Sequence, residues 1–140
     1  MQSREPYAPR PLYQLGIMTE SLRTQQTVIV TEAAGVQVQV HVGGEVDLGS
    51  ATALRMAIEQ AVAVAAVTQV VVDLGEVGFL DSSGIVVLVA ARKQAAGRGV
   101  TLTVVNARGM VHRVLDVAGV LAFLAGAQPS AEPADSTRPS

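Results

Sequence analysis

The segment VVVDLGEVGFLDSSGIVVLVAARK, which runs from Val70 to Lys93, decides the fold. It begins with β-branched residues typical of a buried strand, continues into a short turn, and ends in a long apolar stretch that suits a helix. The four residues Asp-Ser-Ser-Gly, numbers 81–84, stand where this helix should begin. Asp and Ser side chains at such a point can accept hydrogen bonds from the free N–H groups of the first helical turn. The segment therefore predicts a strand followed by a capped helix.

Strand and helix patterns alternate on both sides of this segment. Residues Val36–Val42 alternate strictly between apolar and polar, which predicts a sheet strand with one solvated face. Ser50 is a candidate N-cap for the helix that follows it. The other expected elements are strands at Thr27–Ala33, Gln69–Leu74 (buried on both faces), Val100–Asn106 and, more weakly, Val120–Leu124, and helices over 83–96 and Gly109–Ala118. The order β-β-α-β-α-β-α-β predicts an α/β fold, a mixed sheet of about five strands with three to four helices packed on it.

The prolines mark the expected limits of the folded domain. All six lie near the two ends of the chain, outside residues 12–128. We expect a flexible N-terminal extension over 1–24, one folded domain over 25–126, and a flexible C-terminal tail over 127–140. The longest uninterrupted apolar runs have about seven residues, whereas a spanning helix needs about 20. We expect a cytoplasmic protein without direct membrane insertion.

Composition excludes several classes of function. The formal net charge is -2 and the basic residues are scattered, which argues against a nucleic-acid partner. The chain has no cysteine, so thiolate metal sites are excluded, and His41 and His112 form no metal-ligand pair. No phosphate-binding loop or dinucleotide fingerprint is present. We expect no cofactor, no metal and no enzymatic activity.

The two serines can be interpreted as a structural helix cap or as a functional site. A hydrolase nucleophile elbow needs Gly two residues before and two after the serine, and Leu80 before Ser82 breaks that spacing. The serines can simply cap the helix. The helix itself is unusual, because Ile85–Ala91 is apolar at every position, so Val86 and Val87 should point outward. An exposed apolar surface usually marks a partner site, although a deeply buried helix would explain it too.

Three motifs in order resemble the bacterial anti-sigma factor antagonists of the STAS domain family. They are GEVD at 44–47, VVVDLGEVGFLDSSGI at 70–85 and ARGMVHRVLDVAGV at 107–120, and the resemblance covers about residues 26–125. It implies a STAS-type domain that acts in transcription regulation and the stress response. It also implies partner switching: the unphosphorylated form binds an anti-sigma factor with serine kinase activity and releases sigma. Phosphorylation of the first serine, Ser82, ends binding, and a serine phosphatase resets the switch.

The resemblance also implies roles for the neighbouring residues. Asp81 would orient the serine, Ser83 would cap or support the helix start, and Gly84 would belong to the same motif. Asp47 and its neighbourhood would lie on the partner surface, to which the apolar pattern of the helix independently assigns Val86 and Val87. Two alternatives need no modification of Ser82: a STAS scaffold that does not switch, and a soluble STAS subunit of a membrane transport complex.

Overall fold

A five-stranded mixed sheet forms the centre of the computed structural model, which describes residues 16–18, 21–31 and 35–126. The strands follow chain order across the sheet and are β1 (Gly16–Met18), β2 (Leu22–Thr31), β3 (Gly35–Val46), β4 (Val67–Leu80) and β5 (Thr101–Val105). The pairs β1–β2 and β2–β3 are antiparallel, whereas the pairs β3–β4 and β4–β5 are parallel. The predicted α/β class and mixed sheet are confirmed.

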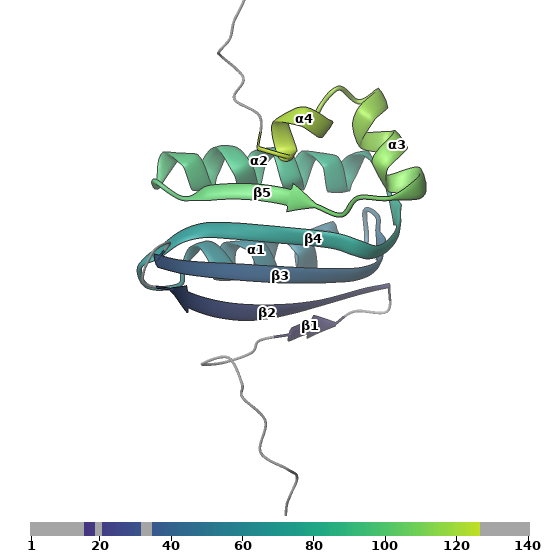
Figure 1. Cartoon of the computed structure of the whole chain (residues 1–140). Helices are drawn as coiled ribbons and strands as arrows, with labels where there is room; N and C mark the ends of the chain where they lie inside the picture. The colour runs from purple at the N-terminus through teal and green to yellow at the C-terminus, as the bar shows by residue number, and fades with distance from the viewer. Residues whose placement is uncertain (1–15, 19–20, 32–34, 127–140) are drawn as a thin grey trace, which may run out of the picture.

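Four helices accompany the sheet: α1 (Ala51–Val62), α2 (Ser82–Gly97), α3 (Gly109–Val117) and α4 (Leu121–Leu124). Helices α1 and α2 cover one face of the sheet, whereas α3 and α4 lie at the β5 side (Figure 1). In the described parts of the chain, no helix has both the length and the apolar character needed to cross a membrane.

The central strand β4 is buried on one face only. Val70, Val72 and Leu74 are fully buried toward the helices, whereas Val71 and Asp73 on the opposite face are partly exposed. The prediction of a strand buried on both faces was therefore wrong, because no helix of the described residues covers the second face (Figure 1). The apolar alternation in β3 behaves as expected, and its even-numbered valines from Val38 to Val42 are buried.

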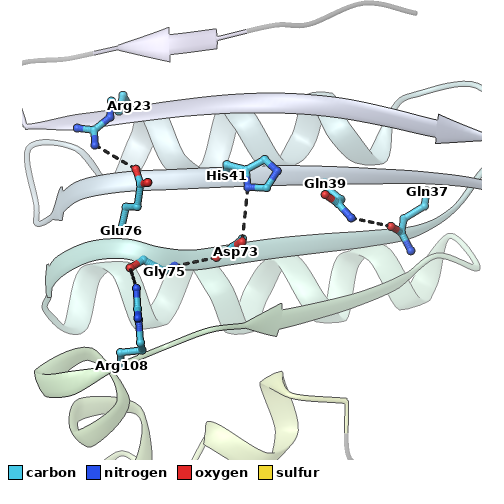
Figure 2. Close-up of polar contacts among 8 residues, drawn as sticks. All are labelled: Arg23, Gln37, Gln39, His41, Asp73, Gly75, Glu76 and Arg108. Atoms are coloured by element: carbon cyan, nitrogen blue, oxygen red, sulfur yellow. Dashed lines mark hydrogen bonds and ion pairs between the residues drawn. The ribbon is translucent and has the colours of Figure 1, made fainter. Parts of the chain in front are cut away.

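The uncovered face of the sheet carries polar side chains that pair across the strands (Figure 2). Asp73 contacts His41 on the neighbouring strand, with 3.5 Å between the carboxylate and Nδ1. Arg23 on β2 reaches across β3 to Glu76, at 3.2 Å. Because these pairs are exposed to solvent, they contribute little to stability. The polar character of this face means that the apolar core lies on the other face of the sheet, under the helices.

The strand β4 continues where the sequence predicted a turn. It runs through Gly75 and Gly78 to Leu80 because it stays paired with β3, whose register shifts twice along this stretch. Each shift places an extra residue on β4, which is the geometry of a β-bulge and tolerates glycine. The strand thereby reaches the start of α2 without any connecting loop.

Two predicted boundaries differ from the structure. The strand predicted at Val120–Leu124 was wrong, because the chain forms helix α4 there. Gly119 adopts the left-handed conformation and the Val120 N–H bonds back to Leu115, so the chain turns away from the sheet before that segment. At the other end, β1 and the start of β2 extend the sheet into the predicted flexible region 1–24, because β2 stays paired with β3 as far as Leu22 opposite Gly44. Residues 1–15 and 127–140, also predicted flexible, lie outside the described residues.

Candidate functional site

The parallel strands β3 and β4 bring two of the predicted motifs together. Their last residues, Val46 and Leu80, are partners in the sheet, so the chain leaves both strands at the same edge. The Asp81 N–H donates to the Val46 carbonyl at 3.1 Å and extends the pairing by one residue. Asp47 of the GEVD motif and Asp81 of the Asp-Ser-Ser-Gly motif thus lie next to each other at this edge.

Asp81, not a serine, caps helix α2. Its backbone is extended, and its Oδ1 accepts hydrogen bonds from the N–H groups of Ser83 at 2.9 Å and Gly84 at 3.4 Å. The Ser83 hydroxyl donates to the same oxygen at 2.5 Å. The prediction that the serines cap the helix was wrong. Asp81 takes this position because its bond to the end of β3 keeps it outside the helix, and Ser82 becomes the first helical residue.

The two serines have different surroundings. Ser82 is exposed, and its hydroxyl forms no hydrogen bond with any other described residue. Ser83 is partly buried, and both its hydroxyl and its N–H bind Asp81. We expected Asp81 to orient Ser82, but no hydrogen bond among the described residues joins them. The Asp81 carboxylate binds Ser83 instead.

The charge of Asp81 is stabilised by these contacts. The Ser83 hydroxyl has the largest effect and lowers the pKa of the carboxyl, whereas desolvation, the next largest effect, raises it. The backbone N–H groups of Ser83 and Gly84 lower it further, and the pKa lies below its usual value. Asp81 therefore stays ionised at neutral pH.

Gly84 is required by close packing at the helix start. A Cβ atom on this residue would lie 2.4 Å from Leu80 Cδ1 and 2.7 Å from Val46 Cγ1. Both of those side chains are fully buried. The glycine thus lets α2 begin directly against the ends of β3 and β4, which fixes the position of the preceding serines.

Asp47 fastens the loop between β3 and α1. Its Oδ1 accepts from the Ser50 N–H at 3.1 Å, and its own N–H donates to Ser50 Oγ at 3.0 Å. The Ser50 hydroxyl donates to the Glu45 carbonyl at 2.8 Å, so Ser50 stands at the predicted N-cap position but its side chain does not cap the helix. Leu48 in this loop is 81% exposed. Sequence reasoning missed Leu48, although a leucine in a polar, glycine-containing loop is a signal.

The two valines predicted to point outward differ. Val86 is 65% exposed, but Val87 is partly buried and packs against the core. Both border a hollow of about 150 Å³ between α1 and α2. Its lining is mainly apolar and consists of Arg55, Ile58, Glu59, Val62, Val86, Val87, Ala90, Ala91, Gln94, Ala95 and Arg98. Val87 lies over this hollow because α1 runs beside α2, which the sequence alone could not reveal.

Comparison with known proteins now adds to this geometry. The sequence model of the STAS domain matches residues 27–134, which is more than half of the chain. The chain belongs to the STAS domain family. This confirms the resemblance found in the sequence. No group of three or more His, Cys, Asp or Glu that could hold a metal ion occurs among the residues the structure describes.

Individual family members resemble the chain closely. It is 45% identical over 87 residues to the anti-sigma-F factor antagonist RsfB of Mycobacterium tuberculosis, covering 62% of this chain and 68% of RsfB. A crystal structure of an anti-sigma factor antagonist from Mycobacterium paratuberculosis has 31% identity and a TM-score of 0.61, covering 79% of this chain and 88% of that one. SpoIIAA in its unphosphorylated form has 18% identity and a TM-score of 0.56, covering 81% and 88%, which shows the shared fold.

Proposed function

We propose that this STAS domain is an anti-sigma factor antagonist controlled by phosphorylation of Ser82. The unphosphorylated form binds an anti-sigma factor that is also a serine kinase, and this binding releases the sigma factor. A serine phosphatase restores the active form. The relatives named as antagonists support the role. The single observation that carries the switch is the exposed hydroxyl of Ser82, which forms no hydrogen bond with another described residue, at the edge where β3 and β4 end.

In this proposal the chain is the substrate of the reaction. The Ser82 oxygen forms a bond to the γ-phosphorus of ATP, the bond to ADP breaks, and the hydroxyl proton is lost. Among the described residues, no hydrogen bond or ion pair joins Ser82 to either histidine: His41 lies on the uncovered sheet face with Asp73, and His112 is exposed on α3. The kinase must therefore supply the base and the nucleotide site.

The position of Asp81 explains why a phosphate on Ser82 would end binding. A phosphate adds about -1.5 to -2 charge. A helix N-terminus normally stabilises an anion, because its free N–H groups can donate hydrogen bonds to the anion. Here the Asp81 carboxylate already accepts from Ser83 and Gly84. The phosphate would gain little from the helix, would stand beside an ionised carboxylate, and would have to be desolvated in a complex.

The partner surface in this proposal surrounds Ser82 on two sides. Val86 lies one helical turn beyond it and is largely exposed. Asp47 and the exposed Leu48 lie in the adjacent loop. Val87 contributes from the hollow between α1 and α2. Apolar side chains beside a phosphorylation site would make the complex sensitive to any charge placed there.

Titration of variants against an anti-sigma factor tests the proposal. Ser82→Ala adds no charge and should bind like wild type, whereas Ser82→Asp should bind at least about tenfold more weakly, which corresponds to about 1.4 kcal/mol. Thr101→Asp is the matched control, because it places the same charge on an exposed residue at the opposite end of the parallel strands. Equal affinity of all variants would contradict the switch and leave a STAS scaffold that does not respond to phosphorylation.

A further inference from the structure

We propose that Asp81 selects which of the two adjacent serines is phosphorylated, by holding the hydroxyl of Ser83 and leaving that of Ser82 free. This inference rests on the proposed function, because it concerns the same phosphorylation. A kinase that approaches this edge meets two chemically identical hydroxyl groups on consecutive residues. The structure distinguishes them by their hydrogen bonds and exposure.

The Ser83 hydroxyl is engaged in the folded protein. Its proton points to Asp81 Oδ1 at an oxygen–oxygen distance of 2.5 Å, and its N–H donates to the same atom at 2.9 Å. A hydrogen bond to an ionised acceptor is stronger than one between neutral groups. To attack a phosphoryl group, this oxygen would have to leave that bond and turn toward solvent from a partly buried position.

The Ser82 hydroxyl has no such restraint. It is exposed on the first residue of α2, and it bonds to no other described residue. It can rotate to meet a kinase-bound ATP without breaking a contact. Its backbone is nonetheless fixed, because the helix start packs through Gly84 against Leu80 and Val46.

The stability of the two possible products also favours reaction at Ser82 over reaction at Ser83. Transfer of the γ-phosphoryl group from ATP to a serine oxygen breaks the bond to ADP and releases the hydroxyl proton, whichever serine reacts. A phosphate on Ser83 would lie directly against the Asp81 carboxylate, since the two oxygens are now in hydrogen-bond contact. Two negative groups at that separation repel each other strongly. Asp81 is thus a positioning residue that disfavours reaction at Ser83.

Site mapping by mass spectrometry tests this selection. Wild type, Asp81→Gly and Asp81→Asn would be incubated with ATP and a panel of anti-sigma factors that have serine kinase activity. Gly is tolerated at an N-cap, and Asn keeps an acceptor oxygen, so both variants should retain the helix. Asp73→Asn is the matched control, because Asp73 Oδ1 also accepts a backbone N–H, that of Gly75, but lies on the uncovered sheet face and outside the proposed partner surface.

Wild type and Asp73→Asn should carry phosphate on Ser82 alone. In Asp81→Gly the ratio of phosphate on Ser83 to that on Ser82 should rise at least about tenfold, as loss of one hydrogen bond to a charged group implies. Asp81→Asn should give a smaller rise. In a Ser82→Ala background, only the variant that also carries Asp81→Gly should become phosphorylated.

Phosphate confined to Ser82 in Asp81→Gly would overturn the inference and show that position along the chain selects the serine. A second measurement is independent of any kinase. The Ser83 hydroxyl proton should exchange with water more slowly than that of Ser82 by NMR, and Asp81→Gly should abolish the difference. Equal exchange in wild type would also overturn the inference. A complete lack of phosphate on wild type would contradict the proposed function, and the exchange rates would still decide the role of Asp81.

Discussion

Replacement of Gly84 by alanine should disturb the packing that positions the candidate site. The added Cβ would lie 2.4 Å from Leu80 Cδ1 and 2.7 Å from Val46 Cγ1, whereas carbon atoms pack best at about 3.5–4.0 Å. Both neighbours are buried, so they can move only by displacing other core atoms. Such overpacking costs about 1–3 kcal/mol, and the better helix propensity of alanine offsets about 0.5–1 kcal/mol. We expect a net loss of about 1–2 kcal/mol.

Chemical denaturation would measure this loss, with Gly97→Ala as the control. Gly97 lies in the same helix, but a Cβ there would meet nothing within 4 Å. Its substitution should leave stability unchanged or raise it by up to about 1 kcal/mol. Leu80→Ala should cost less in the Gly84→Ala background than in wild type, because it removes the clashing methyl group. If Gly84→Ala is as stable as Gly97→Ala, close packing is not the reason for this glycine.

Three further changes test other contacts. Ala66 has a left-handed backbone (φ 65°), so Ala66→Gly should stabilise the protein by up to about 1 kcal/mol, and a lower melting temperature would contradict this. Arg92 donates to the Leu102 carbonyl and lies over the Phe123 ring at 4.7 Å. Arg92→Ala should therefore lower the free energy of unfolding by about 1–3 kcal/mol in a denaturant titration. Lys93 is exposed, so Lys93→Ala should change it by less than about 0.5 kcal/mol. The folded pKa of Asp81 lies below the ordinary 3.8, so its stabilisation is complete above that value and is lost as pH falls toward the folded pKa. Acid melting curves should show that Asp81→Asn lacks this loss, and an unchanged acid response would refute it.

The fold could be predicted from the sequence wherever one periodicity dominated. The alternation in Val36–Val42 predicted which residues of β3 face the core, and the apolar stretch after Ser83 predicted helix α2. The extent of β4 could not be predicted, because Gly75 and Gly78 favour a turn locally and only pairing with β3 keeps them in a bulged strand. Val120–Leu124 suits either a strand or a helix, and the turn at Gly119 decides for the helix.

The position of the candidate site was predictable, but its hydrogen bonds were not. Asp and Ser are about equally good N-caps, so three candidates in a row could not be separated by propensity. The bond from Asp81 to the Val46 carbonyl decides the matter, and it comes from a strand more than thirty residues away. Val87 likewise differs from Val86 because Val87 packs against the core, whereas Val86 stays largely exposed. Contacts between distant segments thus determine the details that local sequence leaves open.

Displacement of a sigma factor tests the central claim most directly. A preformed complex of sigma and its anti-sigma factor would be titrated with the unphosphorylated protein and with protein phosphorylated on Ser82. The unphosphorylated form should release sigma at stoichiometric amounts, and the phosphorylated form should need at least about tenfold more. Equal release by the two forms would contradict the Ser82 switch, and no release by either form would contradict the antagonist function itself.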